Sequence, residues 1–251
     1  MRIEQGSSSE LTRQIVESAL AGYSMGRFCE DRSLPSEAAK AYVVEQTMAL
    51  TRGKNRRYCA AFSDGGQVLG LLVYGISDWD TEHFGFPFAS LSFFVLCHAF
   101  ERAEVADALL GEFDAWCARQ RIRFVSSKLP SLALSEIHAM ERHGFVFIES
   151  SLYNMVSLHA LEEHDPALPT LRVAGPDDAA VMVEYAKGAF ASQRFYADSN
   201  FDKAKADSLY ERWILSGFAS EDMQTLVLDV DGEPAAFMMY MPMDLREYFG
   251  F

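Results

Sequence analysis

The chain contains two stretches in which two apolar runs are separated by a short turn. In each stretch the first apolar run stops at an Asp-Gly pair and the second begins shortly after it. Aspartate and glycine tolerate the positive φ angles of tight turns, so this pattern favours an antiparallel β-hairpin. The predicted hairpins comprise residues 58–62, 64–66 and 68–76 in the first half, and residues 225–230, 231–233 and 234–240 in the second.

Apolar residues at helical spacing predict the elements around these hairpins. Residues 10–50 predict two helices separated at Pro35, with Ser33 or Ser36 as the cap of the second helix. The remaining predicted elements are strand 88–96, helix 101–121, strand 123–127, helix 132–143 ended by Gly144, strand 146–158, strand 171–173, and helices 176–190 and 202–216. Helix 101–121 is amphipathic, and its apolar face carries Val105, Leu109, Leu110, Phe113 and Trp116.

Both halves thus follow one plan of helices and then a hairpin, which predicts a mixed α/β fold. Residues 162–169 are acidic and contain proline, as linkers often do, and they separate a domain over residues 1–161 from one over residues 170–251. The second domain leaves one sheet edge whose N–H and C=O groups need partners. We expect the first half or a second chain to cover this edge, and the second case would give a homodimer.

The composition excludes several classes of partner. The chain has 251 residues, of which 49% are apolar, and a formal net charge of −14 that is spread over both halves. Nucleic acid is not an expected partner, because phosphate neutralisation needs clustered Lys and Arg. We interpret the basic residues 52–57 as a solvated loop before a strand. No signal peptide or membrane-spanning run is recognisable, so a cytoplasmic location is expected.

The cysteine and histidine positions do not predict a metal site. His138 and His143 are five residues apart and therefore do not share a helix face as a His-x-x-x-His pair would. Residues 229–232 begin like a calcium loop but lack its later ligands, and a hairpin turn explains them. We expect no metal, and reduced, buried thiols at the four widely spaced cysteines, Cys29, Cys59, Cys97 and Cys117.

Two local strings resemble a known family. Residues 79–86 are similar to the Trp-Asp-x-x-Phe-Phe-Gly string of the amino-terminal part of TDP-fucosamine acetyltransferase-like proteins, with His83 in place of the first Phe. Residues 189–198 and 209–214 are similar to the Ala-Phe-x-x-Ser-Arg-Phe and Tyr-x-x-Trp-Ile elements that open the catalytic domain of this family, except that Gln193 separates Ser from Arg. The predicted elements of residues 10–158 also resemble the GNAT acyltransferase fold.

The resemblance implies a tandem GNAT-like α/β protein with a mixed central sheet, complete in the first half and partial in the second. It also implies transfer of acetyl from acetyl-CoA to a small-molecule amine, which in this family is a nucleotide-linked aminosugar. The family binds the CoA pyrophosphate with backbone N–H groups of a glycine-rich turn before the long helix. Residues 96–103 contain no glycine, so we expect the first half to be non-catalytic.

In the second half, the corresponding turn and the tyrosine that serves the family as acid would lie beyond Phe251. Catalytic and cofactor-binding residues are therefore not assigned. The resemblance places the candidate substrate-binding residues in the second half, and these are Arg194, Phe195, Tyr196, Asp198 and Tyr240.

Three of these candidates also have a structural explanation. Arg194 suits an acceptor diphosphate because its guanidinium donates two parallel hydrogen bonds, but it would equally pair with Asp198 or Asp202. Phe195 and Tyr196 would form either an aromatic wall for a sugar or base, or the packing between two helices.

Other motif residues have structural expectations as well. Tyr210 and Trp213 lie within one helical turn and are expected in the core. Trp79, Asp80, Phe84 and Gly85 are expected in a turn between strands, where Asp80 caps local amides and Gly85 adopts a positive φ.

Two functional hypotheses follow. In the first, the chain is a shortened form of an enzyme that acetylates a small amine. In the second, it is a non-catalytic pseudo-acyltransferase that acts as a binding or scaffold module. Motifs of hydrolases and of dinucleotide-dependent dehydrogenases are absent from the sequence. A glycine-rich turn and a tyrosine beyond Phe251 would favour the enzyme.

Overall fold

The computed structural model describes residues 1–22, 36–52, 55–97, 102–152 and 171–242. They belong to two compact units, unit 1 with its described residues in Met1–Val146 and unit 2 in Phe147–Asp244. The expected linker, residues 162–169, lies outside the described residues. Helices in the described part of the chain are too short or too polar to cross a membrane.

Unit 1 is built on a mixed five-stranded sheet in which the strands follow the chain in order, β1-β2-β3-β4-β5. The first four strands are antiparallel neighbours, and β5 lies parallel to β4. The elements of unit 1 are β1 (Arg2–Ser7), the 3₁₀ helix η1 (Ser8–Glu10), α1 (Arg13–Leu20), α2 (Ser36–Leu50), β2 (Arg56–Phe62), β3 (Val68–Ile76), α3 (Asp78–Phe84), β4 (Phe88–Leu96), α4 (Arg102–Gln120), β5 (Phe124–Ser127) and α5 (Leu134–Arg142).

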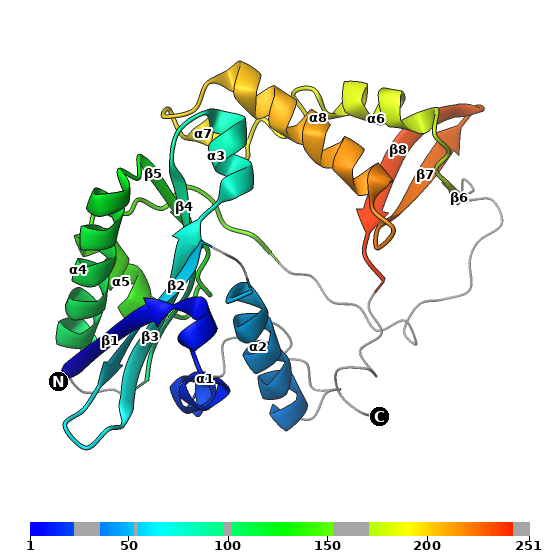
Figure 1. The fold of residues 1–251 in the computed structure, drawn as a ribbon. Helices are drawn as coiled ribbons and strands as arrows, with labels where there is room; N and C mark the ends of the chain where they lie inside the picture. The colour runs from blue at the N-terminus through cyan, green and yellow to red at the C-terminus, as the bar shows by residue number, and fades with distance from the viewer. Residues whose placement is uncertain (23–35, 53–54, 98–101, 153–170, 243–251) are drawn as a thin grey trace. The chain divides into compact units, whose positions relative to one another are not determined.

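Helices cover both faces of this sheet (Figure 1), with α4 and α5 on one face and α1 and α2 on the other. The predicted apolar face of α4 packs on the sheet, where Leu109, Leu110 and Phe113 are at most 1% exposed. Gly70 of β3 permits this close approach, because a Cβ atom there would lie 2.9 Å from the Leu109 side chain. The predicted amphipathic helix is therefore confirmed, and β3 is buried on both faces.

Tyr74 of β3 places a hydroxyl group in the core next to α4. The residue is fully buried, its ring contacts Phe113 and Trp116 at centroid distances of 5.0 Å, and its hydroxyl has no hydrogen-bond partner among the described residues. Burial raises the pKa of Tyr74 to about 12. The Arg57 side chain, which pairs with Tyr74 between β2 and β3, offsets only part of the desolvation cost of this hydroxyl.

We expect Tyr74→Phe to raise the free energy of unfolding by about 1 kcal/mol, because it removes this hydroxyl and keeps the ring contacts. Tyr58→Phe is the matched control, since Tyr58 is 3% exposed but its hydroxyl donates to Glu4 Oε1 at 3.1 Å. That variant should lose about 1 kcal/mol. Urea unfolding of the intact chain measures both, and a destabilised Tyr74→Phe variant would show that the hydroxyl is satisfied.

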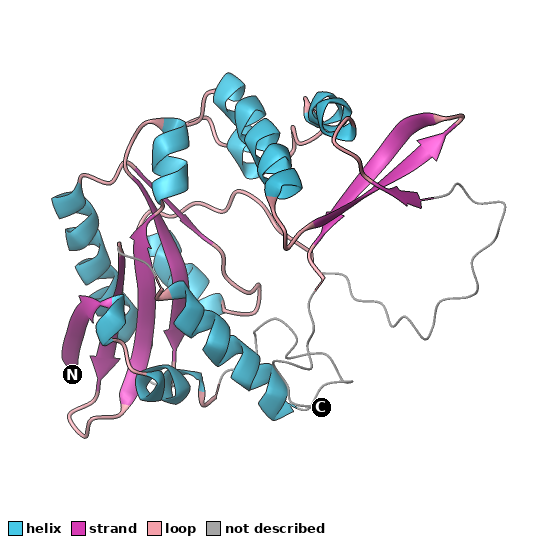
Figure 2. Cartoon of the chain, turned by 45° about the vertical axis from the view of Figure 1, so that its right-hand side comes forward, coloured by secondary structure: helices cyan, strands magenta, loops and turns pink. Residues whose placement is uncertain are grey.

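Unit 2 contains a three-stranded antiparallel sheet of order β6-β7-β8. Its elements are β6 (Leu171–Val173), α6 (Asp178–Ala186), the short α7 (Arg194–Ala197), α8 (Lys203–Ala219), β7 (Gln224–Val230) and β8 (Glu233–Tyr240). Figure 2 shows α6 and α8 on one side of these strands, and Met182, Ile214 and Val227 form the core between the two layers. Both units thus run through strand, helices and hairpin in the same order.

The opposite face of the unit 2 sheet is apolar and exposed. Val173 and Met238 flank Leu226 in the strand register and are 75% and 54% exposed. The outer strands among the described residues are β6 and β8. Association with a second chain through this sheet stays a prediction.

Three expectations about the elements were wrong. Residues 146–152 are not in a strand, and the rest of the predicted strand 146–158 lies outside the described residues. The motif with Trp79 and Asp80 forms the short helix α3 rather than a turn. Gly85 ends this helix with a φ of 76°, so the positive φ expected at this glycine is confirmed. The first residues form an unpredicted strand, β1, which pairs with β2 along the sheet edge.

Candidate functional site

Arg194, the first residue of α7, does not make either of the ion pairs expected for it. Its Nη1 lies 3.6 Å from Glu149 Oε1, and its backbone N–H donates to Glu149 Oε2 at 2.9 Å. The guanidinium also lies 4.7 Å from the centre of the Phe195 ring. A carboxylate that is held by the backbone and the side chain together competes with any phosphate at this place. The predicted ion pair of Arg194 with Asp198 or Asp202 was therefore wrong.

The two aromatic candidates on α7 pack inside unit 2. Phe195 is 5% exposed and meets Phe201 edge to face at 5.1 Å. Tyr196 stacks on Tyr210 at 6.0 Å and donates its hydroxyl to Asp207, and its pKa is raised to about 12, chiefly by burial. Packing between helices, the second of the two alternatives, therefore accounts for these rings.

The remaining candidates do not converge on α7. Asp198 accepts hydrogen bonds from the backbone N–H and the side-chain amide of Asn200, which closes a local turn. Tyr240 lies at the end of β8 and donates its hydroxyl to Gln224 at the start of β7. Figure 1 shows α7 at one end of α8 and this end of the hairpin at the other. The 17 residues of α8 are about 25 Å long, so Tyr240 is not brought next to the candidates on α7.

Of the two α8 residues expected in the core, Tyr210 is buried and Trp213 is exposed. Tyr210 is 7% exposed, stacks on Phe190 at 4.3 Å and bonds through its hydroxyl to Gln193 at 2.6 Å. Trp213, three residues later, is 44% exposed. The inserted Gln193 therefore orders the core of unit 2 through Tyr210.

In unit 1, β4 parts from β5 halfway along its length. The parallel register ends where Leu91 pairs with Ser127, whereas β4 continues to Leu96. At the same place Ser92 is the additional residue of a β-bulge, because Val73 pairs with Phe93 and Tyr74 with Leu91. Bulges redirect backbone groups and are frequent beside functional sites. Among the described residues, the second half of β4 has no strand on the β5 side.

A carboxylate fills the end of the gap between β4 and β5. Glu136, in the first turn of α5, is 3% exposed, and its Oε1 accepts the backbone N–H of Leu96 at 2.9 Å. The N–H groups at this end of β4 are those that would face a ligand entering the gap. Glu136 therefore takes a donor that an incoming anion would need, and it places a negative group there.

On the face of the sheet that α4 and α5 do not cover, polar side chains form a short row beside the β4 bulge. Arg56 of β2 donates through Nη1 to Ser92 Oγ at 2.9 Å, and the Ser90 and Ser92 hydroxyls lie 3.1 Å apart. Ser126 of β5 pairs with Ser90 and therefore points to the same face. Further along, this face is apolar and packs against α1 and α2. Half-buried polar residues beside an apolar core are informative because burying them is costly without a purpose.

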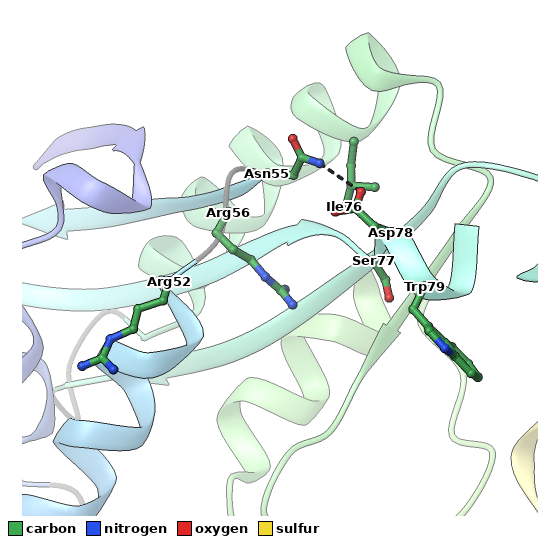
Figure 3. A pocket seen from close by; sticks show the side chains of 7 residues that line it. All are labelled: Arg52, Asn55, Arg56, Ile76, Ser77, Asp78 and Trp79. Atoms are coloured by element: carbon green, nitrogen blue, oxygen red, sulfur yellow. Dashed lines mark hydrogen bonds between the residues drawn. The ribbon is translucent and has the colours of Figure 1, made fainter. Parts of the chain in front are cut away.

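A shallow pocket of about 280 Å³ lies next to this row, where β2 begins and β3 leads into α3. In Figure 3, Arg56 lies between Arg52 on one side and Ser77 and Trp79 on the other. Asn55 donates to Asp78 at 2.9 Å, and Ser77 donates to Asp80 at 2.5 Å, so the rim is held by local hydrogen bonds. The basic residues 52–57, expected to be only a solvated loop, contribute three of its lining residues, and residues 53–54 lie outside the described ones.

The described cysteines are free thiols in or near the core. Burial raises the pKa of Cys59, Cys97 and Cys117 to about 12 in each case. Thiols with pKa values this high are poor nucleophiles at neutral pH. Cys29 and residues 98–101 of the expected cofactor turn lie outside the described residues.

Comparisons with known proteins give structural similarity only. No family model and no curated protein matches the sequence. Solved structures of N-acetyltransferases are similar to 62% of the chain. They include a ribosomal-protein-alanine N-acetyltransferase from Brucella melitensis biovar Abortus 2308 (13% identity, all of that chain covered, TM-score 0.44), an aminoglycoside acetyltransferase from an uncultured soil metagenomic sample (13%, 95%, 0.43) and an aminoglycoside 6′-N-acetyltransferase from Acinetobacter baumannii (18%, 98%, 0.39). Identities this low carry no substrate over to this chain.

Proposed function

We propose that this chain acts in N-acetyl transfer as a protein of the GNAT superfamily. The acetyl donor would be acetyl-CoA, and the acceptor a small-molecule amine, with a nucleotide-linked aminosugar as the candidate that the sequence strings favour. In this proposal unit 1 recognises the acceptor and does not perform the transfer. The tandem arrangement, with unit 2 as part of a second acyltransferase domain, belongs to the same proposal.

The observation that carries the proposal is the form of β4. It is bulged at Ser92, parts from its parallel neighbour after Leu91 and is followed by the long helix α4. Such a gap exposes the N–H and C=O groups of a central strand, which can bond an extended amide-containing ligand as an added strand would. The pantetheine arm of CoA is a ligand of this kind. An ordinary sheet, paired along the full length of β4, would offer no such edge.

The residues of unit 1 do not, however, fit the diphosphate end of acetyl-CoA. Glu136 occupies the N–H of Leu96 at the end of the gap that leads to α4. A buried carboxylate beside a diphosphate costs free energy through like-charge repulsion in a region of low dielectric constant. This contact supports the expectation that the first half is non-catalytic, on grounds independent of the missing glycines.

The second candidate function is a binding or scaffold module with no part in acetyl transfer. The same contact between Glu136 and Leu96 favours it, because a unit that has lost its cofactor site can keep its fold for recognition alone. The two candidates differ in one measurable property, which is whether an acetyl group reaches the acceptor.

The test is an acetyl-transfer assay on the intact chain with acetyl-CoA and two acceptors, a nucleotide-linked aminosugar and the same aminosugar without its nucleotide. We expect transfer to the nucleotide-linked acceptor and weaker transfer to the free aminosugar, because unit 1 is proposed to recognise the acceptor. If no acetyl group is transferred at any acetyl-CoA concentration while the nucleotide still binds, the second candidate, a binding module, is supported. Equal transfer to the two acceptors would contradict recognition of the nucleotide by this chain.

A further inference from the structure

Arg56 of β2 makes no ion pair among the described residues. Its side chain lies half-buried on the sheet, and its hydrogen bond within the described part of the chain goes to a neutral hydroxyl, Ser92 Oγ. By contrast, Arg142 pairs with Asp107 at 2.8 Å, and Arg194 pairs with Glu149. The half-buried Arg102 also donates to a neutral hydroxyl, Ser135 Oγ at 3.2 Å, but Arg56 in addition lines a pocket.

The acidic residue that lines the same pocket is already engaged. Asp78 accepts the side-chain amide of Asn55 at 2.9 Å, which holds this carboxylate at the rim. Arg56 has five N–H donors, and the bond to Ser92 uses one of them. The remaining donors suit a planar or tetrahedral oxyanion, which accepts two parallel hydrogen bonds from a guanidinium. A metal cation is disfavoured beside the same positive charge.

The pocket also offers an aromatic surface next to Arg56. Trp79 is 40% exposed and is held by stacking on His83, with ring centroids 5.6 Å apart and an angle of 8° between the planes. A ring fixed in this way can stack on a planar base at little cost in side-chain entropy. The volume of about 280 Å³ is smaller than that of a full nucleotide-sugar site, so it accommodates one charged end of such a ligand.

We propose that this pocket of unit 1 binds the phosphate-bearing nucleotide end of the acceptor, with Arg56, which Ser92 orients, at the phosphate and Trp79 beside the base. The phosphate contact is thus assigned to Arg56 in place of Arg194, for which it was predicted from the sequence. The choice of a nucleotide as ligand rests on the proposed function. The contacts among Arg56, Ser90 and Ser92 are observed in the structure and do not depend on the choice of ligand.

The test is calorimetric titration of the intact chain with thymidine diphosphate, thymidine and inorganic phosphate. We expect thymidine diphosphate to bind at least about tenfold more tightly than thymidine, because the phosphates add charge-assisted hydrogen bonds. Arg56→Met should weaken this binding by about tenfold or more and leave the affinity for thymidine unchanged. Arg56→Lys should fall between them, since lysine provides a charge without the fork geometry.

Arg194→Met is the matched control, because it removes an arginine of the other unit that is already paired with Glu149. Its affinity for thymidine diphosphate should equal that of the unchanged chain. Ser92→Ala removes the hydroxyl that orients Arg56 without altering charge, and it should weaken binding about threefold. Thermal unfolding of each variant separates a loss of binding from a loss of folding.

Three results would overturn the site: no binding of thymidine diphosphate, equal loss of affinity for thymidine and its diphosphate in Arg56→Met, or loss in Arg194→Met with none in Arg56→Met. The acetyl-transfer assay keeps the two proposals separate. Binding through Arg56 without any acetyl transfer would remove the proposed function and keep the site. Acetyl transfer that is unchanged in Arg56→Met would remove the site and keep the function.

Discussion

Asp178→Asn should destabilise unit 2 by about 2 kcal/mol at pH 7, because it breaks the charge-assisted bonds that join the sheet to α6. Arg172 of β6 donates to both oxygens of Asp178 at 2.7 and 2.8 Å and to Asp229 of β7 at 2.6 Å. Asp178 also accepts the backbone N–H of Gly175 at 2.6 Å. Three segments of unit 2 therefore meet at one ion cluster, and an amide can replace neither the charge nor both acceptors.

The effect should depend on pH in a defined direction. Hydrogen bonds from Arg172 and from the Gly175 N–H lower the pKa of Asp178 to about 2, below its ordinary value. A lowered pKa stabilises the folded state above the unfolded pKa, and this contribution disappears as the pH falls through the folded value. The difference between the unchanged chain and Asp178→Asn should thus be constant from pH 7 to about pH 5 and shrink between about pH 4 and pH 2.

Amide hydrogen exchange of β7 in the intact chain measures this difference within unit 2. Asp177→Asn is the control, because Asp177 is exposed and its side chain makes no capping hydrogen bond. It should change β7 protection by less than about 0.5 kcal/mol. Equal protection of β7 in the Asp178→Asn variant and the unchanged chain would show that the cluster does not hold the sheet.

Glu136→Ala should produce the second large effect, a loss of about 3 kcal/mol in the free energy of unfolding. It leaves the Leu96 N–H without its acceptor and opens a cavity between α5 and β4. Glu136→Gln keeps an acceptor oxygen and the side-chain volume, so its loss should stay below about 1 kcal/mol. Urea unfolding of the intact chain measures both variants.

Glu141→Ala, an exposed position on the same helix, controls for changes in α5 that have no link to β4. Faster exchange at the Leu96 amide in Glu136→Ala, with little change in Glu136→Gln, would locate the effect at this hydrogen bond. Similar stability of Glu136→Ala and Glu141→Ala would contradict the role assigned to Glu136.

Much of the fold could be predicted because its signals are periodic and local. The apolar face of α4, the hairpins and the glycines at positive φ each follow from residues that are close in sequence. Strand β1 was missed because it lies at the sheet edge, and only Gly6 of its six residues is buried. Its polar composition gives no alternation for a pattern to reveal.

The site could not be predicted from the sequence because its contacts join distant residues. Glu136 lies 40 residues from Leu96, and Arg56 lies 36 residues from Ser92. No spacing rule relates such pairs, which meet only when the sheet register is set. Arg194 was chosen because it lies in a recognisable string, but the structure gives it a carboxylate partner, Glu149, 45 residues away.

The most direct test of a closed cofactor gap in unit 1 is a calorimetric titration of the intact chain with acetyl-CoA at pH 7. We predict no saturable binding below about 100 μM for the unchanged chain, and tighter binding for Glu136→Gln, in which the negative charge at the Leu96 N–H is removed. Stoichiometric binding to the unchanged chain at low micromolar concentration would contradict this.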